Sequence, residues 1–162
     1  MSNFKIQTPC VGICSTVYGD NVCRGCKRFS HEIIDWNQYA NEQKQLVWDR
    51  LIALQSKILD QKIKIIDINK LKKYSTQEKL RVNFDFPPSS WVFQVVVSNT
   101  GKINNLEICG LKVLPDYQHL QIKELSELIT EEYYQLSLAH FNISFSRHPL
   151  EKLARAFPEL PR

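Results

Sequence analysis

Residues 10–28 read CVGICSTVYGDNVCRGCKR and contain four of the five cysteines of this 162-residue chain. The spacing is C-x3-C-x8-C-x2-C, so two close pairs, Cys10 with Cys14 and Cys23 with Cys26, flank a turn-rich middle. A tetrahedral metal ion needs four soft donors, and two short cysteine loops can supply them. A glycine lies inside each pair, where a chelating loop must bend tightly. The stretch therefore predicts a metal site with these four cysteines as ligands.

Three cations stand beside the second cysteine pair: Arg24, Lys27 and Arg28. Four thiolates around a divalent ion leave a formal charge of about −2. Neighbouring cations offset that charge and favour the deprotonated thiol, which is the form that binds metal. We therefore expect Arg24, Lys27 and Arg28 to surround the ligands.

The identity of the metal is less well defined by the spacing. Zinc is favoured, because a closed set of four thiolates is typical of structural zinc sites. An iron–sulfur cluster is the alternative, since four thiolates hold such clusters too, although the usual ferredoxin spacings are absent. A third reading, free redox thiols in Cys23-Arg24-Gly25-Cys26, would need a βαβ setting that this segment lacks.

The residues around the cysteines predict a small hairpin-helix module over residues 1–40. Tyr18-Gly19-Asp20-Asn21 is turn-prone and lies between two β-prone stretches, residues 13–17 and 22–23, which favours a hairpin. Ser30 is a suitable N-cap for a short helix directly after the cysteines. Cysteine loop, hairpin, cysteine loop and helix follow each other as in small treble-clef zinc modules.

Several motifs in this region also resemble a known family. They are Pro9-Cys10-Val11-Gly12-Ile13-Cys14, Cys23-Arg24-Gly25-Cys26-Lys27-Arg28, Glu32-Ile33 with Trp36, and Gln43, Lys44, Val47 and Leu51. Together they resemble the short bacterial proteins of domain of unknown function 1289, over residues 9–52. Members are commonly described as predicted iron–sulfur proteins, so the resemblance implies the same four ligands and no known reaction. The chain differs at Tyr18-Gly19, where an acidic stretch is typical, and at Tyr39, where Met or Leu is usual.

Residues 41–83 are expected to form a helical connector. From Asn41, Val47, Leu51, Leu54 and Ile58 recur at helical spacing and predict one amphipathic helix. The stretch 57–79 that follows has seven lysines and three acidic residues, which is typical of a solvated face.

The same lysine-rich stretch could also contact nucleic acid. The candidate contacts are Lys70, Lys72 and Lys73, with Tyr74 as a stacking residue. A formal net charge of only +4 gives no strong basic footprint, so nucleic acid is possible but not favoured as a partner.

Residues 84–162 are expected to form a separate ββαβα unit, which makes the whole chain α+β. Pro87-Pro88 cannot continue a helix and marks the boundary. Apolar patterning predicts strands over 91–98 and 103–113, a helix over 122–136, a strand over 141–145 and a last helix beginning at Pro149. Cys109 is predicted to be a buried, inert thiol in the second strand.

Composition limits the function. With 43% hydrophobic and 23% charged residues, the chain has an ordinary globular composition, which excludes wholesale disorder and fibrous folds. No apolar run reaches the roughly 20 residues of a membrane span, and no signal peptide is evident, so a cytoplasmic protein without membrane contact is expected.

No nucleophile with a suitably spaced base stands out, so an enzyme is not favoured. The sequence therefore predicts a metal-stapled accessory protein with a protein partner. The alternatives are an iron–sulfur protein in electron transfer or redox sensing, and a nucleic-acid-binding accessory.

Overall fold

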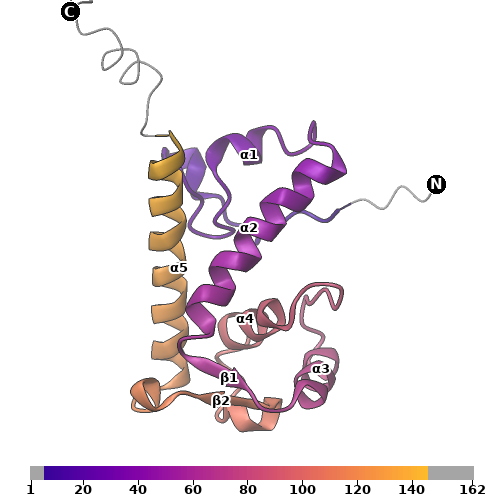
Figure 1. The fold of residues 1–162 in the computed structure, drawn as a ribbon, viewed down its shortest axis with the longest axis vertical. Coiled ribbons are helices and arrows are strands. Elements are labelled where there is room, and N and C mark those ends of the chain that lie inside the picture. The colour runs from indigo at the N-terminus through magenta and orange to yellow at the C-terminus, as the bar shows by residue number, and fades with distance from the viewer. Residues whose placement is uncertain (1–5, 146–162) are drawn as a thin grey trace, which may run out of the picture.

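The computed structural model describes residues 6–145 and combines helices with one small sheet (Figure 1). In chain order, the elements are η1 (Ser15–Tyr18), α1 (Ser30–Ile34), α2 (Asn41–Leu59), β1 (Ile63–Ile65), α3 (Ile68–Gln77), α4 (Pro88–Ser98), η2 (Leu106–Cys109), β2 (Leu111–Val113), η3 (Pro115–Tyr117) and α5 (Ile122–Phe145), where η denotes a 3-10 helix. This mixture confirms the α+β class. No described helix is long and apolar enough to cross a membrane.

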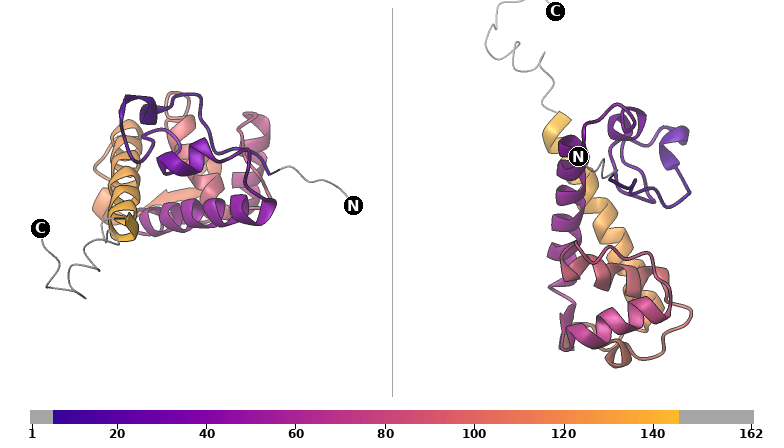
Figure 2. Two further views of the ribbon diagram at one scale, coloured as in Figure 1. Left: turned by 90° about the horizontal axis from the view of Figure 1, so that it is seen from above. Right: turned by 90° about the vertical axis from the view of Figure 1, so that its right-hand side faces the viewer.

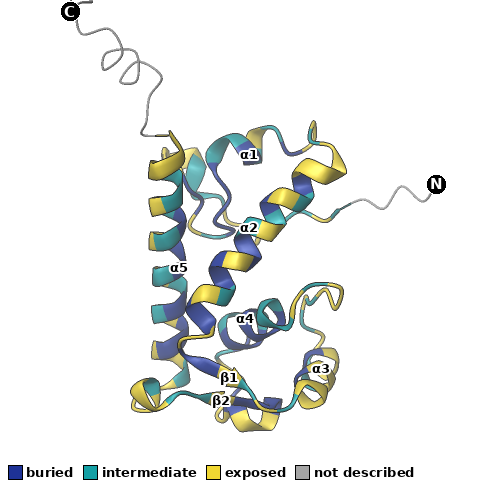
Figure 3. Ribbon diagram, in the orientation of Figure 1, coloured by how far each residue is buried: buried dark blue, intermediate teal, exposed yellow. Residues whose placement is uncertain are grey.

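Helices α2 and α5 are the two long elements, and each buries one face (Figure 3). In α2, the predicted stripe of Val47, Leu51, Leu54 and Ile58 is buried. The cysteine loops and α1 lie at one end of the molecule, and the sheet, α3 and α4 lie at the other (Figures 1 and 2). The predictions of a short helix after the cysteines, of a long helix from Asn41 and of a helix over residues 122–136 are confirmed.

Strands β1 and β2 form a two-stranded antiparallel sheet that the sequence did not indicate in this form. Ile63 pairs with Val113 and Ile65 with Leu111, so the sheet joins residues on either side of the proline break. Only residues 111–113 of the predicted strand 103–113 form a strand, because Leu106–Cys109 is a 3-10 helix that ends at Gly110 in the left-handed region.

The prediction of a strand over residues 91–98 is wrong, because this segment is helix α4. Five of its side chains are buried, namely those of Trp91, Val92, Phe93, Val95 and Val96. A helix that is apolar on nearly all sides has no polar face, and its period therefore cannot be read from hydropathy. Pro88 stands in the first turn of α4, where a helix tolerates a missing N–H.

Two further strand predictions are wrong, and with them the ββαβα order. Residues 141–145 continue α5, since Phe141 and Phe145 are four residues apart and share a helix face. The hairpin expected between the cysteine pairs is replaced by η1 and a single bridge between Val22 and Phe29. The helix predicted from Pro149 lies outside the described residues.

One hydrophobic core spans the predicted boundary at residue 84. It contains Leu51 and Leu59 of α2, Val95 of α4, Leu111 of β2 and Ile129 of α5. Lys62, nearly fully buried, also pairs with Glu132 of α5 at 2.5 Å. Independent folding of residues 84–162 remains a prediction, and this shared core argues against it.

Candidate metal centre

Backbone hydrogen bonds close the loop that carries Cys23 and Cys26. The N–H of Cys23 donates to the carbonyl of Arg28 at 2.9 Å, and the N–H of Lys27 donates back to the carbonyl of Cys23 at 2.8 Å. Lys27 has a φ of 62°, in the left-handed region that a non-glycine residue seldom adopts. The chain therefore makes a tight reversal directly after the second cysteine of the pair.

Three backbone N–H groups near Cys23 act to lower the pKa of its thiol. They belong to Cys26, Ser15 and Gly25. Burial raises the pKa of the Cys23 thiol, but these donors and a hydrogen bond with Cys26 outweigh burial, so that the net pKa is lowered. Hydrogen bonds to the charged form favour it, so this loop stabilises a thiolate at Cys23.

Cys26 has a charged neighbour. Its burial raises the pKa of the thiol, and the net shift is upward even though Arg28 acts in the opposite direction. Arg28 donates from Nε to Cys26 Sγ at 3.4 Å and is itself buried. Its guanidinium carbon lies 4.9 Å from the centre of the Trp36 ring.

The first cysteine pair is more open than the second. Cys10 and Cys14 are half-buried. The N–H of Gly12, whose φ is 95°, donates to Cys10 Sγ at 3.4 Å. Cys14 Sγ and Thr16 Oγ1 share a hydrogen bond of 3.0 Å.

The two cysteine loops lie against each other. A Cβ on Gly25 would stand 2.7 Å from a methyl carbon of Val11 and 2.8 Å from the carbonyl oxygen of Ile13, so only glycine fits at this contact. The N–H of Arg24 donates to Ser15 Oγ at 2.9 Å across the same junction.

The structure thus brings the four thiols into two adjoining loops, and the donor set consists of soft sulfur ligands that suit zinc or iron. Within residues 6–145, no three His, Cys, Asp or Glu side chains stand in an arrangement that could already hold a metal ion. The four-ligand site remains a prediction.

The other two predicted cations, Lys27 and Arg24, make different contacts from those of Arg28. Lys27 is buried and donates from Nζ to the carbonyls of Arg24 and Gly25, the latter at 3.1 Å. Burial lowers the pKa of Lys27 to about 8, although the nearby thiols of Cys23 and Cys26 act to raise it.

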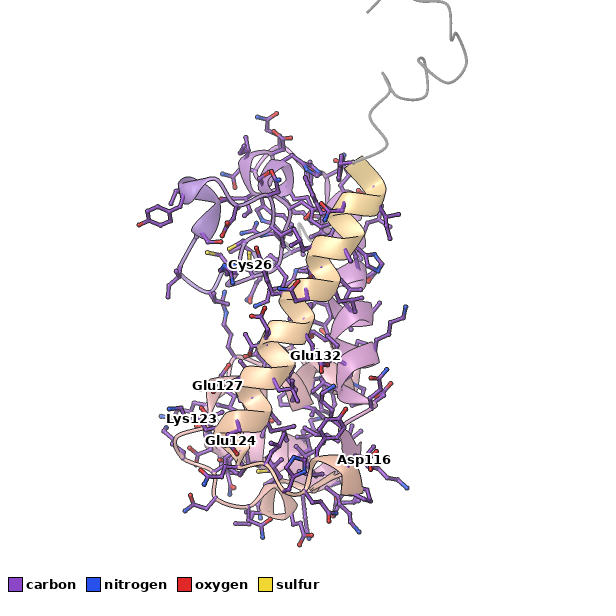
Figure 4. The ribbon with its side chains drawn as sticks, turned by 90° about the vertical axis from the view of Figure 1, so that its left-hand side faces the viewer. Cys26, Asp116, Lys123, Glu124, Glu127 and Glu132 are labelled. Atoms are coloured by element: carbon purple, nitrogen blue, oxygen red, sulfur yellow. The ribbon has the colours of Figure 1, made fainter. Side chains whose placement is uncertain are left out.

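The side chain of Arg24 contacts Asp20 and Tyr134. Its Nε lies 3.6 Å from a carboxylate oxygen of Asp20, and its guanidinium carbon lies 4.2 Å from the ring centre of Tyr134 on α5. In Figure 4, Cys26 lies level with the C-terminal half of α5, far along the helix from Glu124 and Glu127.

The ion pair that fixes the cysteine module on α2 was missed from sequence. Glu32 of α1 accepts from Arg50 of α2 through both carboxylate oxygens, with one distance of 2.7 Å, and also from the N–H of Phe29 at 2.8 Å. Glu32 is buried, and the guanidinium carbon of Arg50 lies 3.8 Å from the centre of the Phe29 ring. The sequence feature that could have indicated this ion pair is Glu32, an acidic residue in the first turn of a helix, but only the fold shows that Arg50 is its partner.

The candidate nucleic-acid contacts do not form one unit. Lys70, Lys72 and Lys73 are exposed on α3. Tyr74, by contrast, packs against the core, and its hydroxyl accepts from Asn99 Nδ2 at 2.8 Å. Tyr74 is therefore engaged within the fold and is poorly placed to stack on a base.

Cys109, the fifth cysteine, is fully buried in η2, which confirms its predicted burial although not its predicted strand. Burial, together with the charge of Glu78, raises the pKa of its thiol to about 11.

Comparison with known proteins gives a match for the cysteine segment only. No curated protein and no solved structure matches the chain. Residues 8–55 match the family model described as "Protein of unknown function (DUF1289)". The match covers both cysteine loops, α1 and most of α2. Residues 8–55 are therefore similar to the DUF1289 family, as the cysteine spacing and the following helices predict, and form one segment of this 162-residue chain.

Proposed function

We propose that Cys10, Cys14, Cys23 and Cys26 bind one zinc ion whose role is structural, in an accessory protein that binds another protein. When bound, the ion cross-links the two cysteine loops. The chain's own residues supply the thiolates, the N–H donors that stabilise them and the buried cation Arg28 beside Cys26.

The junction of the two cysteine loops carries this proposal, because the close contacts at Gly25 and the hydrogen bond from Arg24 to Ser15 bring the two cysteine pairs together. One contrast supports it. Cys23 and Cys109 are both nearly fully buried, yet the pKa of Cys23 is lowered while that of Cys109 is raised to about 11. Burial alone makes a thiol neutral and inert, as at Cys109. At Cys23, the backbone donors favour the thiolate, which is the form that binds metal.

The small apolar core of the cysteine module supports a structural role. Its buried apolar cluster consists of Val22 and Phe29 with Tyr134 of α5. Such a module buries too little apolar surface to be stable alone, and metal binding is the usual way in which short cysteine-rich segments compensate.

The proposed partner surface lies on the cysteine loops and η1. Val11, Ile13, Val17 and Tyr18 are all exposed, Ile13 by 76% and Tyr18 by 89%. Exposed apolar side chains that are grouped in this way often mark protein contacts. Helix α2, by contrast, buries most of its apolar side chains within the fold.

The metal is tested by elemental analysis and absorbance of protein purified without air. We expect a colourless protein with one zinc per chain. Cys23→Ser should lose the metal, whereas Cys109→Ser, the matched control at a buried thiol outside the loops, should retain it. Absence of any bound metal would overturn the proposal.

Iron with acid-labile sulfide, and a visible colour that bleaches on reduction, would instead support the iron–sulfur alternative. The function would then move toward electron transfer or redox sensing.

Partner binding is tested with the double variant Ile13→Ser/Tyr18→Ser. Any protein that copurifies with the chain should be lost from this variant while its zinc content is unchanged. Retention of the copurifying protein would place the contact elsewhere.

Nucleic-acid binding is a second and weaker candidate. Lys70, Lys72 and Lys73 are exposed on one helix, and none of them takes part in an ion pair within the part of the chain that the structure describes. Fluorescence anisotropy with a single-stranded RNA at several salt concentrations tests it. Salt-dependent binding that the triple Lys→Gln variant abolishes would establish this function.

A further inference from the structure

We infer that metal at the cysteine site acts as a latch on α5, so that loss of the metal frees the last two turns of that helix while the remainder stays folded. These terminal turns are residues 138–145. The inference rests on the proposed metal function and adds to it a conformational response to metal loading.

The two ends of α5 belong to different clusters of the core. Leu125, Ile129 and Tyr133 lie in the main core with α2 and α4. Leu138 and Phe141 instead pack against the second cluster, which is made of Val22, Phe29 and Tyr134. The terminal turns therefore depend on the cysteine module for their apolar contacts.

Aromatic contacts join the module to these turns. The ring of Phe29 meets Phe141 edge-on with 5.2 Å between ring centres, and Phe145 edge-on with 5.9 Å. His31 meets Phe145 at 5.0 Å. Figure 2 shows the cysteine loops beside this end of α5.

The side chains that hold the terminal turns stand at both ends of the second cysteine loop. Val22 precedes Cys23, Phe29 follows Arg28, and the two residues form a bridge. A metal bound through Cys23 and Cys26 would fix the loop between them. Without metal, the loop is closed by its backbone hydrogen bonds and by contacts of Lys27 and Arg28, and we expect Val22 and Arg24 to leave Tyr134 more readily.

The response should remain local. The ion pair between Glu32 of α1 and Arg50 of α2 involves no cysteine, so we expect α1 to stay attached to α2 when metal is lost. At the C-terminal end of α5, Ile143 and Phe145 are already exposed, so few other contacts hold the terminal turns in place. Segments with few buried contacts open at low free energy, independently of the global transition.

Hydrogen exchange read by mass spectrometry tests the latch on the full chain. Zinc-loaded protein is compared with the same protein after chelation and with Cys23→Ser. We expect exchange of residues 138–145 to rise by roughly tenfold or more without metal, while residues 123–133 are unchanged. Re-adding zinc should restore protection, and Cys109→Ser should behave as wild type.

Phe141→Leu supplies a second test that leaves the cysteines intact. This variant should bind zinc normally but show fast exchange of residues 138–145 even when loaded, since its contact with Phe29 is lost. Metal content is measured on every sample, so that failure of the proposed metal site can be distinguished from failure of the proposed latch. A zinc-bound protein in which chelation leaves residues 138–145 unchanged, or exposes all of α5, overturns the latch alone. A chain that never takes up metal overturns both.

Discussion

Arg28 donates from Nε to the sulfur of Cys26 at 3.4 Å, and both side chains are buried. A buried guanidinium on a thiol is costly unless that sulfur carries negative charge, and a metal-bound thiolate does. Outer groups that hydrogen-bond to metal ligands typically change metal affinity by about 10- to 100-fold.

Arg28→Gln should therefore weaken zinc binding by about tenfold. The measurement is competition with a colorimetric chelator at fixed pH. Arg24→Gln is the matched control, because Arg24 pairs with Asp20 and not with a sulfur. Equal affinities of the two variants would contradict a role for the Arg28 contact.

Arg50→Met should destabilise the protein by about 3 kcal/mol, because it leaves the buried Glu32 carboxylate without its charged partner. Urea unfolding followed by circular dichroism measures the loss. Gln45→Ala, which removes an exposed hydrogen bond to Asp49 on the same helix, should cost well under about 1 kcal/mol. A loss at Arg50 as small as that control would show that the ion pair contributes little.

Stability should fall between about pH 9 and pH 11 in a manner that depends on Cys109. Its pKa is about 11 in the folded protein, against 9.0 for an unperturbed thiol. In this interval the unfolded chain releases the proton and the folded chain keeps it, so rising pH favours unfolding. The contribution is fully present below pH 9 and lost as pH passes 11.

Cys109→Ala removes this titration, so its unfolding free energy should decline less steeply over the same interval. Denaturant unfolding at pH 8, 9 and 10 measures the two slopes. Parallel slopes for the variant and the wild type would contradict the raised pKa.

A fragment of residues 84–162 should fail to fold alone. It retains α4, β2 and α5, but it lacks α2, which supplies Leu51, Leu54 and Ile58 to their core, and β1, which pairs with β2. Circular dichroism and urea titration of the fragment are the measurement, with the full chain as control. A soluble fragment with a cooperative transition would restore the separate domain that the proline break suggested.

The sequence by itself determined the cysteine loops, the short helix after them, the long helix α2, residues 122–136 of α5 and the burial of Cys109. Each depends on local information, namely ligand spacing, a helical apolar stripe or the apolar character of one residue. The tertiary structure alone decided that 88–98 is a helix, that β1 pairs with β2 across the proline break, and that Glu32 faces Arg50. A segment that is apolar on every side has no readable period, and a strand's or a charge's partner lies far along the chain, where local sequence carries no record of it.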